Sequence, residues 1–421
     1  MRRLRVAGGL TQRELAEPAY TRAFVAAIES GARTPSDEAL AYIAARLGVG
    51  SEDLRHGRPR GIAAMLRARL AEARRRLSHG EVEAAAVEFR AVRAEALEYQ
   101  LPEIVGWAEY CAGDVFLHRG EVAAATAMYE AVDAATPGDA VRLRAAVTAR
   151  LAYAWFALGE TQRALVLLEG RLRALRATPD QNPDAQMRVA SMLMYVYNEL
   201  DWSERARRLE DEVLPLVPLV TDQEWIAQFR SIAAQLRRAE SELDDVERLI
   251  AESERRYEDA GLRREIGICH WARGYVLRRA DRLAEAAAEF RQARAVLAEV
   301  AAVQDHAGAT LELAEVLRRQ GILDEAAELA AEAARTSALT GHSEGRAEAD
   351  RLLGLVSGQR GEIAEAERYL TSAADRYESA GLMAELVTTC GLLGELLLHE
   401  RRRDEAMAVL RRGLRGAEKI R

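Results

Sequence analysis

The side chains most often used in catalysis and metal binding do not form a recognisable site in this chain. It has seven histidines and three cysteines. No two histidines have the spacing of metal ligands on a helix, and Cys111, Cys269 and Cys390 are far apart and odd in number, which argues against a zinc site or a disulfide framework. Nucleotide-binding glycine motifs and the nucleophile elbow of hydrolases are also missing from the sequence. We therefore expect no enzyme activity, no cofactor and no metal, and we expect the cysteines to be buried apolar residues in a reducing compartment.

The composition is that of a folded, water-soluble protein. Of the 421 residues, 49% are hydrophobic and 30% are charged, and 67 acidic against 59 basic residues give a net charge of −8. No apolar run has the length of a membrane span, and Met1-Arg2-Arg3-Leu4-Arg5 is not followed by the apolar core of a secretory signal. We expect a cytoplasmic protein with no membrane partner. No proline follows Pro218, which favours helices over the last 200 or so residues.

Charge is distributed unevenly along the chain. Residues 1–60 contain 10 Arg and 7 Asp or Glu, a net charge of +3, whereas residues 61–421 carry −11. A basic head on an acidic body is compatible with a head that binds DNA and a body that binds another partner. Because Gly57, Pro59 and Gly61 interrupt a charged segment, we predict one domain over residues 1–57 and a second over residues 61–421.

Small residues recur at a period of about forty in the body. One column of alanines is interrupted only by Val246. Its members are Ala85, Ala125, Ala164, Ala206, Ala286, Ala326, Ala366 and Ala406. Twelve residues earlier lies a second column, which is Gly or Ala at eight of nine positions: Ala73, Gly113, Ala152, Met194, Ala234, Gly274, Ala314, Gly354 and Gly394. A third column contains larger residues: Phe89, Tyr129, Leu168, Ile250, Phe290, Leu370 and Leu410. Glycines at 80, 120, 159, 321 and 361 mark a turn before the alanine column.

This order of small, small and large columns indicates pairs of antiparallel helices. Small residues on both helices of a unit allow a close approach, and we expect the larger residue to fill the space between neighbouring units. The columns resemble those of the tetratricopeptide repeat, with a period of forty in place of the usual 34. The resemblance implies an all-α, right-handed solenoid of about nine helical hairpins, whose first helices line a concave groove.

Transferring the inner positions of such repeats to this sequence gives a candidate effector groove. Its predicted residues are Trp107, Tyr110, Asp114, Tyr153, Arg188, Tyr195, Asn198, Gln228, Gln235, Arg238, Trp271, Tyr275, Arg278, Glu315 and Arg318. Amides and arginines can hydrogen-bond a peptide backbone or a carboxylate, and aromatic rings offer flat contact area. For any single position, a solvated or packing role is the alternative interpretation.

The head has the capping signals of short helices. Thr11-x-x-Glu14 is a capping box that predicts a helix beginning at Gln12 and ending before Pro18. Thr21 can cap a second helix that ends at Gly31, and Ser51 a final short one. We expect a small core from the apolar side chains Leu15, Ala16, Val25, Ile28, Leu40, Ile43, Ala44, Leu47 and Leu54.

Residues 10–54 resemble the Xre/Cro-type helix-turn-helix of bacterial and phage regulators. The matching motifs are Leu10-Thr11-Gln12-x-x-Leu15-Ala16, Ile28-Glu29-x-Gly31 and Arg33-x-Pro35-Ser36. The resemblance implies that the second helix of the motif enters the major groove of double-stranded DNA. The implied DNA-binding residues are Gln12, Thr21, Arg22, Ala23, Ala26 and Arg33. Compared with the family, the first helix is expected to be truncated, and a start upstream of Met1 stays open.

Head and body together resemble the RRNPP regulators, in which a tetratricopeptide-like body binds a signalling peptide, and similar actinobacterial proteins. The resemblance implies a transcription regulator that acts as a homodimer, with a peptide or protein ligand in its groove. The alternative is an interaction scaffold whose repeats bind a partner protein and whose helix-turn-helix is vestigial.

Overall fold

The computed structural model describes residues 1–59, 61–178, 182–236 and 243–418, and every element within these ranges is a helix. The chain divides into two compact units, Met1–Glu72 with Glu88–Ala108 and Ala73–Val87 with Glu109–Arg421. The all-α prediction is confirmed, whereas a domain boundary between residues 57 and 61 stays a prediction. No helix of the described ranges is long and apolar enough to cross a membrane.

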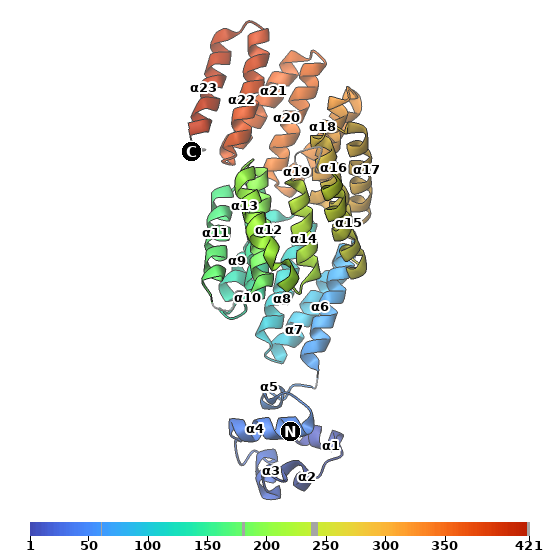
Figure 1. Cartoon of the computed structure of the whole chain (residues 1–421), viewed down its shortest axis with the longest axis vertical. Coiled ribbons are helices and arrows are strands. Elements are labelled where there is room, and N and C mark those ends of the chain that lie inside the picture. Colours follow the sequence, from blue (N-terminus) through green and yellow to red (C-terminus); the bar gives the residue numbers. More distant parts are fainter. Residues whose placement is uncertain (60, 179–181, 237–242, 419–421) are drawn as a thin grey trace. The chain divides into compact units, whose positions relative to one another are not determined.

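Five short helices form the N-terminal part of the first unit (Figure 1). They are α1 (Arg2–Ala7), α2 (Gln12–Ala16), α3 (Arg22–Glu29), α4 (Asp37–Leu47) and α5 (Ser51–Arg55). The predicted capping box of α2 is present, with Thr11 and Glu14 bonded reciprocally, and the Thr21 hydroxyl accepts from the backbone of Phe24. The prediction for Ser51 was wrong by one residue: Gly50 occupies the N-cap, and Ser51 is the first helical residue.

The core of these helices is the predicted one. Leu15, Val25 and Ile43 are fully buried, and Ile28 and Leu47 pack partly buried against the same cluster. Met1, the N-cap of α1, and Leu4 of α1 join it. The apolar positions of α2, α3 and α4 therefore meet at one point, which holds α3 with its opposite face outward.

Eighteen helices follow, and they make nine consecutive hairpins within the described residues. The hairpins are α6 (Ile62–Ser78) with α7 (Val82–Glu98), α8 (Pro102–His118) with α9 (Val122–Ala135), α10 (Val141–Ala157) with α11 (Thr161–Ala177), α12 (Pro183–Glu199) with α13 (Ser203–Val213), α14 (Gln223–Gln235) with α15 (Leu243–Ala260), α16 (Arg263–Arg279) with α17 (Leu283–Glu299), α18 (Val303–Arg319) with α19 (Leu323–Thr340), α20 (Ser343–Gln359) with α21 (Ile363–Ser379), and α22 (Met383–His399) with α23 (Arg403–Glu418). The predicted tetratricopeptide-type solenoid and its count of hairpins are confirmed.

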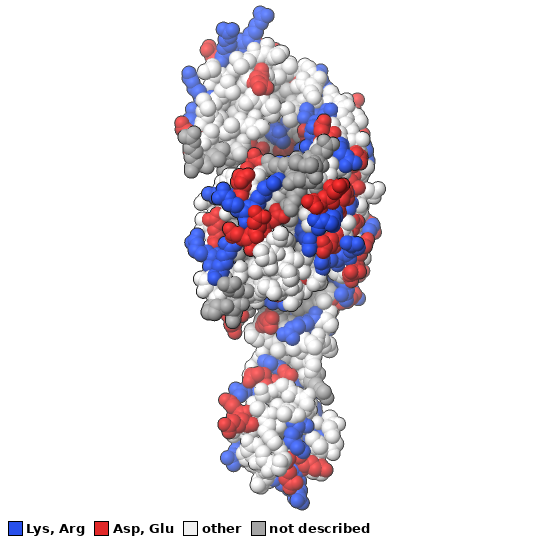
Figure 2. All heavy atoms as spheres, viewed as in Figure 1, with Lys and Arg blue, Asp and Glu red and all other residues white. Residues whose placement is uncertain are grey.

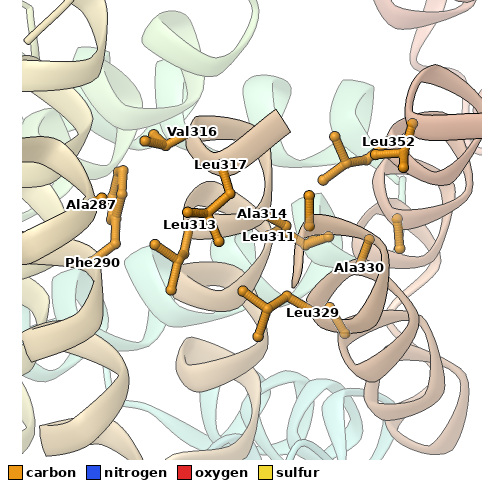
Figure 3. Close-up of a cluster of buried hydrophobic side chains, with 14 of the residues drawn as sticks. Ala287, Phe290, Leu311, Leu313, Ala314, Val316, Leu317, Leu329, Ala330 and Leu352 are labelled. Atoms are coloured by element: carbon orange, nitrogen blue, oxygen red, sulfur yellow. The ribbon is translucent and has the colours of Figure 1, made fainter. Parts of the chain in front are cut away.

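The small-residue columns lie where the two helices of a hairpin touch. Every alanine of the first column is fully buried. A Cβ added to Gly113 would lie 2.4 Å from the ring of Tyr129, and one added to Gly274 would lie 2.8 Å from the ring of Phe290. The large third-column residue therefore packs over the glycine of its own hairpin, a contact that the repeat pattern had assigned only to neighbouring units. Phe290 also belongs to a core that runs through α17, α18, α19 and α20 (Figure 3).

Turns of early hairpins, which follow one another at about forty residues, contact turns of later hairpins within the second unit. Three turn glycines inside early hairpins have a positive φ and lie against turns that connect later hairpins. The pairs are Gly80 with Val300, Gly120 with Thr340, and Gly159 with Ala380. His118 adds a contact of 2.6 Å between its Nε2 and the carbonyl oxygen of Val300. Helices about five and a half repeats apart are thus brought together.

The fourth hairpin departs from the regular pattern. Its second helix, α13, has 11 residues and leads into a 3-10 helix, η1, at Leu214–Leu219. Pro215 and Pro218 lack the backbone N–H of an α-helical bond, which explains the break. The Asp184 carboxylate then receives the backbone N–H groups of Thr221 and Asp222, at 3.0 and 2.8 Å. This contact fixes the start of α14.

Arginines and carboxylates alternate over the face of the body that Figure 2 shows. Many form exposed ion pairs at helical spacing, such as Arg282 with Glu285 and Arg402 with Glu405. Pairs of this kind stabilise a helix by only a few tenths of a kcal/mol. They are a solvated surface, as the sequence indicates.

The contact at Gly113 makes the packing testable. Gly113→Ala places a methyl group against the buried Tyr129 ring, and we expect the free energy of unfolding to fall by about 1–2 kcal/mol, because overpacking outweighs the gain in helix propensity. Urea unfolding followed by tryptophan fluorescence measures the change.

Gly170 supplies the matched control. It lies within α11, and a Cβ there meets nothing within 4 Å, so Gly170→Ala is expected to stabilise the protein by about 0.5–1 kcal/mol. Stabilisation by both substitutions would contradict the assignment of the glycine column to helix contact.

Candidate effector cavity and nucleic-acid interface

The second unit contains a cavity of about 260 Å³. Its walls come mainly from the first helices of successive hairpins, α10, α12, α14, α16 and α18, with Arg74 of α6, Tyr110 of α8 and Tyr257 of α15 added. The predicted arrangement, in which first helices line the groove, agrees with this lining. Arg74 and Tyr110 reach the cavity because early and later hairpins lie against each other.

Of the fifteen groove residues predicted from the repeats, ten belong to the third to sixth of these repeats, and seven of these ten line the cavity. They are Tyr153, Arg188, Tyr195, Gln228, Gln235, Trp271 and Tyr275. Asn198 is buried next to the lining residue Glu199, and Arg278 forms a 2.9 Å ion pair with the lining residue Glu312. Arg238 lies outside the described residues. Of the five groove residues predicted in α8 and α18, Tyr110 lines the cavity, whereas Trp107, Asp114, Glu315 and Arg318 do not.

Ion pairs dominate the end of the cavity where α14, α16 and α18 begin. Arg74 binds Glu224 at 2.6 Å, and Arg264 binds Asp305 at 2.6 Å and Glu265 at 3.2 Å. Burial alone would lower the pKa of the Arg264 guanidinium, but the facing carboxylates outweigh it and raise the pKa. These arginines are permanently charged and held in place by carboxylates, so this end presents fixed donors to a ligand.

Two side-chain contacts place α16 at this end. Ser78, at the end of α6, donates its hydroxyl to Glu265 at 2.6 Å and accepts the backbone N–H of Arg264 at 3.0 Å. Burial would raise the pKa of Glu265, but Arg264 and the Ser78 hydroxyl outweigh it and lower the pKa. The first turn of α16 is therefore tied to the first hairpin.

Amide and aromatic side chains form the middle of the cavity. Arg188 donates to the side-chain oxygen of Gln228 and lies 5.9 Å from the centre of the Trp225 ring. The rings of Tyr153 and Tyr195 are 6.3 Å apart. Burial raises the pKa of both phenols, so both are neutral hydrogen-bonding groups. A cavity with flat apolar walls and a few fixed polar groups is typical of a ligand site.

The sequence prediction missed cavity residues of two kinds. Met192, Ile232 and Glu312 occupy one column of the forty-residue register, one helical turn from the column that contains Tyr195 and Gln235. That spacing could have identified them. Arg150 lies in the same column as Met192, and Arg74 lies in the column of Tyr153 and Tyr195, so the register applies to both arginines. That Arg74 of the first hairpin reaches the same cavity as α14 depends on how far the solenoid winds, for which the repeat pattern gives no signal.

The head is organised around one buried carboxylate. Glu29, at the end of α3, accepts hydrogen bonds from Arg5 of α1 at 2.8 and 3.0 Å and from the Gln12 amide of α2 at 3.0 Å. The Glu29 side chain is 4% exposed. Its hydrogen bond with Arg5 outweighs burial and lowers the pKa of the carboxyl group. Glu29 thereby joins three helices, and Gln12 uses its amide nitrogen inside the head.

The outward face of α3 contains most of the residues predicted to contact DNA. Thr21, Arg22 and Ala23 are exposed at its N-terminal end, and Ala26 is half-buried. Arg33 is exposed and lies 4.7 Å from the centre of the Phe24 ring. The structure thus places these five residues on or beside one short helix.

Comparison with known proteins agrees with a chain made of a helix-turn-helix head and a helical repeat body. Residues 1–57 match the family model of a helix-turn-helix domain. This chain combines a helix-turn-helix domain with a tetratricopeptide-like body. No curated protein matches the chain.

Three solved structures similar to the chain are informative. A Rap protein complexed with Competence and Sporulation Factor has 13% identity and a TM-score of 0.59, over 85% of this chain and 98% of that one. A signal transduction ATPase with a tetratricopeptide repeat sensor from Pyrococcus horikoshii has 13% identity and a TM-score of 0.50, over 79% and 52%. The apo quorum sensor NprR from B. thuringiensis has 14% identity and a TM-score of 0.49, over 84% and 99%. At these identities the likeness concerns the fold alone.

The ion pair of Glu29 leads to a prediction for the helix-turn-helix. At neutral pH, Glu29→Gln removes a charge-assisted bond to Arg5, and we expect the local stability of α3 to fall by about 2 kcal/mol. Because the folded pKa is lowered, this contribution is present above the ordinary carboxyl value of 4.5 and is lost as the pH falls through the folded value. Hydrogen exchange of the α3 amides measures it.

The exposed pair Arg13–Glu17 provides the control. Glu17→Gln is expected to change the protection of α3 by less than about 0.5 kcal/mol. Equal losses for the two variants, or a Glu29→Gln effect that persists at acid pH, would show that the buried ion pair does not hold the domain together.

Proposed function

We propose that this protein is a transcription regulator whose helix-turn-helix binds double-stranded DNA and whose body binds a peptide or another effector in the cavity. The observation that supports the proposal most strongly is the cavity itself, which combines fixed arginines, amides and aromatic rings in one lining. The Rap protein of similar fold was solved with Competence and Sporulation Factor bound. The expected absence of enzyme activity and of a cofactor is part of this proposal.

The exposed end of α3 supports DNA binding by the head. Arg22 stands at the first position of the helix, where its guanidinium can reach a guanine edge in the major groove, and Thr21 and Arg33 can reach phosphates. We further propose a homodimer in the cytoplasm, because two heads on two half-sites provide the usual geometry of such regulators.

The linker offers a route by which the body can influence the head. Arg58, in the linker, donates to the carbonyl oxygens of Tyr99 and Gln100 at 2.5 Å each, beyond the C-terminal end of α7. It is only 9% exposed and also lies 3.8 Å from Asp53 of the α5 helix. We propose that this contact transmits a change in the first hairpin to the helix-turn-helix.

The scaffold alternative has one observation in its favour. Ala23, Ala26 and Ala27 leave α3 with few polar side chains for reading bases. In that case the cavity would bind a segment of a partner protein, and the head would bind DNA weakly and without regard to sequence.

Arg22 tests the DNA-binding proposal. Arg22→Ala is expected to weaken binding to a selected duplex by about 1–3 kcal/mol and to relax specificity at one base pair. Fluorescence anisotropy at two salt concentrations measures both effects. Arg291→Ala, an equal loss of charge in α17, is the control. Equal affinity of the Arg22 variant and the native protein would exclude the assigned role of α3, and sequence-blind binding would favour the scaffold.

Arg58 tests the coupling. Arg58→Ala is expected to leave intact both the binding of a short-peptide mixture and the DNA affinity without peptide, and to reduce the change in DNA affinity that the mixture causes. A typical coupling of about 1–3 kcal/mol corresponds to a change of about 5–150-fold. Arg67→Ala, which removes an exposed arginine of α6, is the control. An unchanged response in the Arg58 variant would exclude the linker contact as the route.

A further inference from the structure

The far end of the cavity, where α12 and α16 end, is acidic. Glu199 and Glu312 line it, and Glu344 of α20 and Glu385 of α22 lie within electrostatic reach of Glu199. All four side chains belong to half-buried residues. Burial and the neighbouring carboxylates Glu312 and Glu385 raise the pKa of Glu199 to about 7. Burial and neighbouring glutamates also raise the pKa of Glu344 and of Glu385.

The arginines at this end are already engaged by other groups. Arg278 pairs with Glu312 at 2.9 Å, and Arg351 binds Glu348 through two bonds of 3.0 and 2.5 Å. Arg279, which lowers the pKa of Glu199, donates to the Tyr275 hydroxyl at 3.2 Å. In the described part of the chain, Glu199, Glu344 and Glu385 have no ion-pair partner. Among the described residues, negative charge is therefore in excess at this end of the cavity, whereas the arginines of the other end are matched by carboxylates.

The side-chain amide of Asn198 is buried next to Glu199, and its oxygen accepts no hydrogen bond from a described residue. Asn198 is 4% exposed, and its amide nitrogen lies 3.5 Å from a carboxylate oxygen of Glu199. Its Oδ1 is buried and has no hydrogen-bond partner among the described residues. A buried acceptor without a donor is costly. Ionised carboxylates cannot satisfy it, because they only accept hydrogen bonds, but a ligand that carries N–H donors can.

Two aromatic rings border these carboxylates. Tyr195 of α12 and Tyr275 of α16 line the cavity, and Glu199 contributes to the raised pKa of both phenols. Ring faces attract cations such as ammonium and guanidinium groups. Within the described residues, no three carboxylate, histidine or cysteine side chains are grouped to hold a metal ion. Carboxylates together with aromatic faces match an organic cation.

We propose that Glu199, Tyr195 and Tyr275 of the cavity wall form a subsite for a primary ammonium or guanidinium group of the effector, with Asn198 adjacent to it and with Glu344 and Glu385 adding negative charge. The inference rests on the proposed effector function of the cavity, and it adds the direction in which the effector lies in the cavity. Arg188 and Glu199 are eleven residues apart on α12, roughly 16 Å at 1.5 Å per residue. An extended chain of about five residues spans that distance. The effector is a short linear molecule, with its cationic end at Glu199 and its carboxylate or carbonyl end at the arginines.

Binding of a cation at this subsite is linked to proton release. The cation favours the ionised form of Glu199, whose pKa of about 7 leaves it largely protonated at pH 6. Affinity for the cation is therefore expected to rise from pH 6 to pH 8. The groups that face Glu199 are the carboxylates of Glu312, Glu344 and Glu385, the Arg279 guanidinium and the phenols of Tyr195 and Tyr275.

Agmatine, which carries a guanidinium and a primary ammonium group, is the probe for the subsite. Titration calorimetry of the full chain is expected to show binding that is weakened about ten- to a hundredfold by the double substitution Glu199→Gln and Glu344→Gln. Single Glu199→Gln is expected to flatten the pH dependence. Glu285→Gln, on the exposed face of α17, is the charge-matched control. Because the native carboxylates repel one another, the double variant is expected to have an equal or higher Tm at pH 8, which shows that it is folded.

Binding of random pentapeptide mixtures tests the cation subsite and the proposed effector function separately. The mixture with free N-termini is expected to bind more tightly than an N-acetylated mixture, and the double variant is expected to abolish this binding. That result supports both the cation subsite and the peptide effector. Equal binding of the two mixtures by a protein that ignores agmatine overturns the subsite and leaves the effector cavity. Agmatine binding without binding of either mixture overturns the peptide effector and retains the subsite. Agmatine binding that the double variant leaves unchanged overturns the subsite.

Discussion

The structure of the body depends on how closely two helices of a hairpin can approach. Close contacts are made where a glycine such as Gly113 or Gly274 faces a large buried ring of the same hairpin, Tyr129 or Phe290. This packing keeps the first helices of successive hairpins side by side, so residues forty positions apart come to one wall. Tyr195, Gln235 and Tyr275 share that wall for this reason. The site is therefore a consequence of the repeat, and a substitution at the glycine column would disturb the binding surface as well as the stability.

Winding converts that wall into a cavity with two different ends. The turn glycines of early hairpins fit against the turns of later ones, and Ser78 ties α6 to the first turn of α16. Arg74 is thereby placed beside Glu224, and the entry to α14 becomes a site of fixed positive groups. At the other end, Glu199, Glu344 and Glu385 have no ion-pair partner among the described residues. This difference between the two ends is the physical basis for the proposed direction of the ligand, because an anionic group placed beside Glu199 would be repelled by the carboxylates there.

Local rules and periodicity predicted much of this structure. The capping box at Thr11, the start of α3 after Thr21 and the count of hairpins follow from side-chain chemistry and from a register that persists over the body. The same register placed Tyr153 and Trp271 in the cavity wall. It could not bring Arg74 of the first hairpin to Glu224 of α14, because that contact depends on how far the solenoid winds. Nor did it predict that Gln12, expected at the DNA surface, would bond Glu29, since that contact needs the angle between α2 and α3.

The central claim is that occupancy of the cavity changes the affinity of the helix-turn-helix for DNA. The most direct measurement is a fluorescence anisotropy titration of the full chain on duplex from its own promoter, at two salt concentrations, with and without the random pentapeptide mixture. The account predicts sequence-specific binding that weakens with salt and an affinity that the peptides change by about 5–150-fold. Weak binding without sequence preference, or specific binding that the peptides leave unchanged while they occupy the cavity, would contradict it.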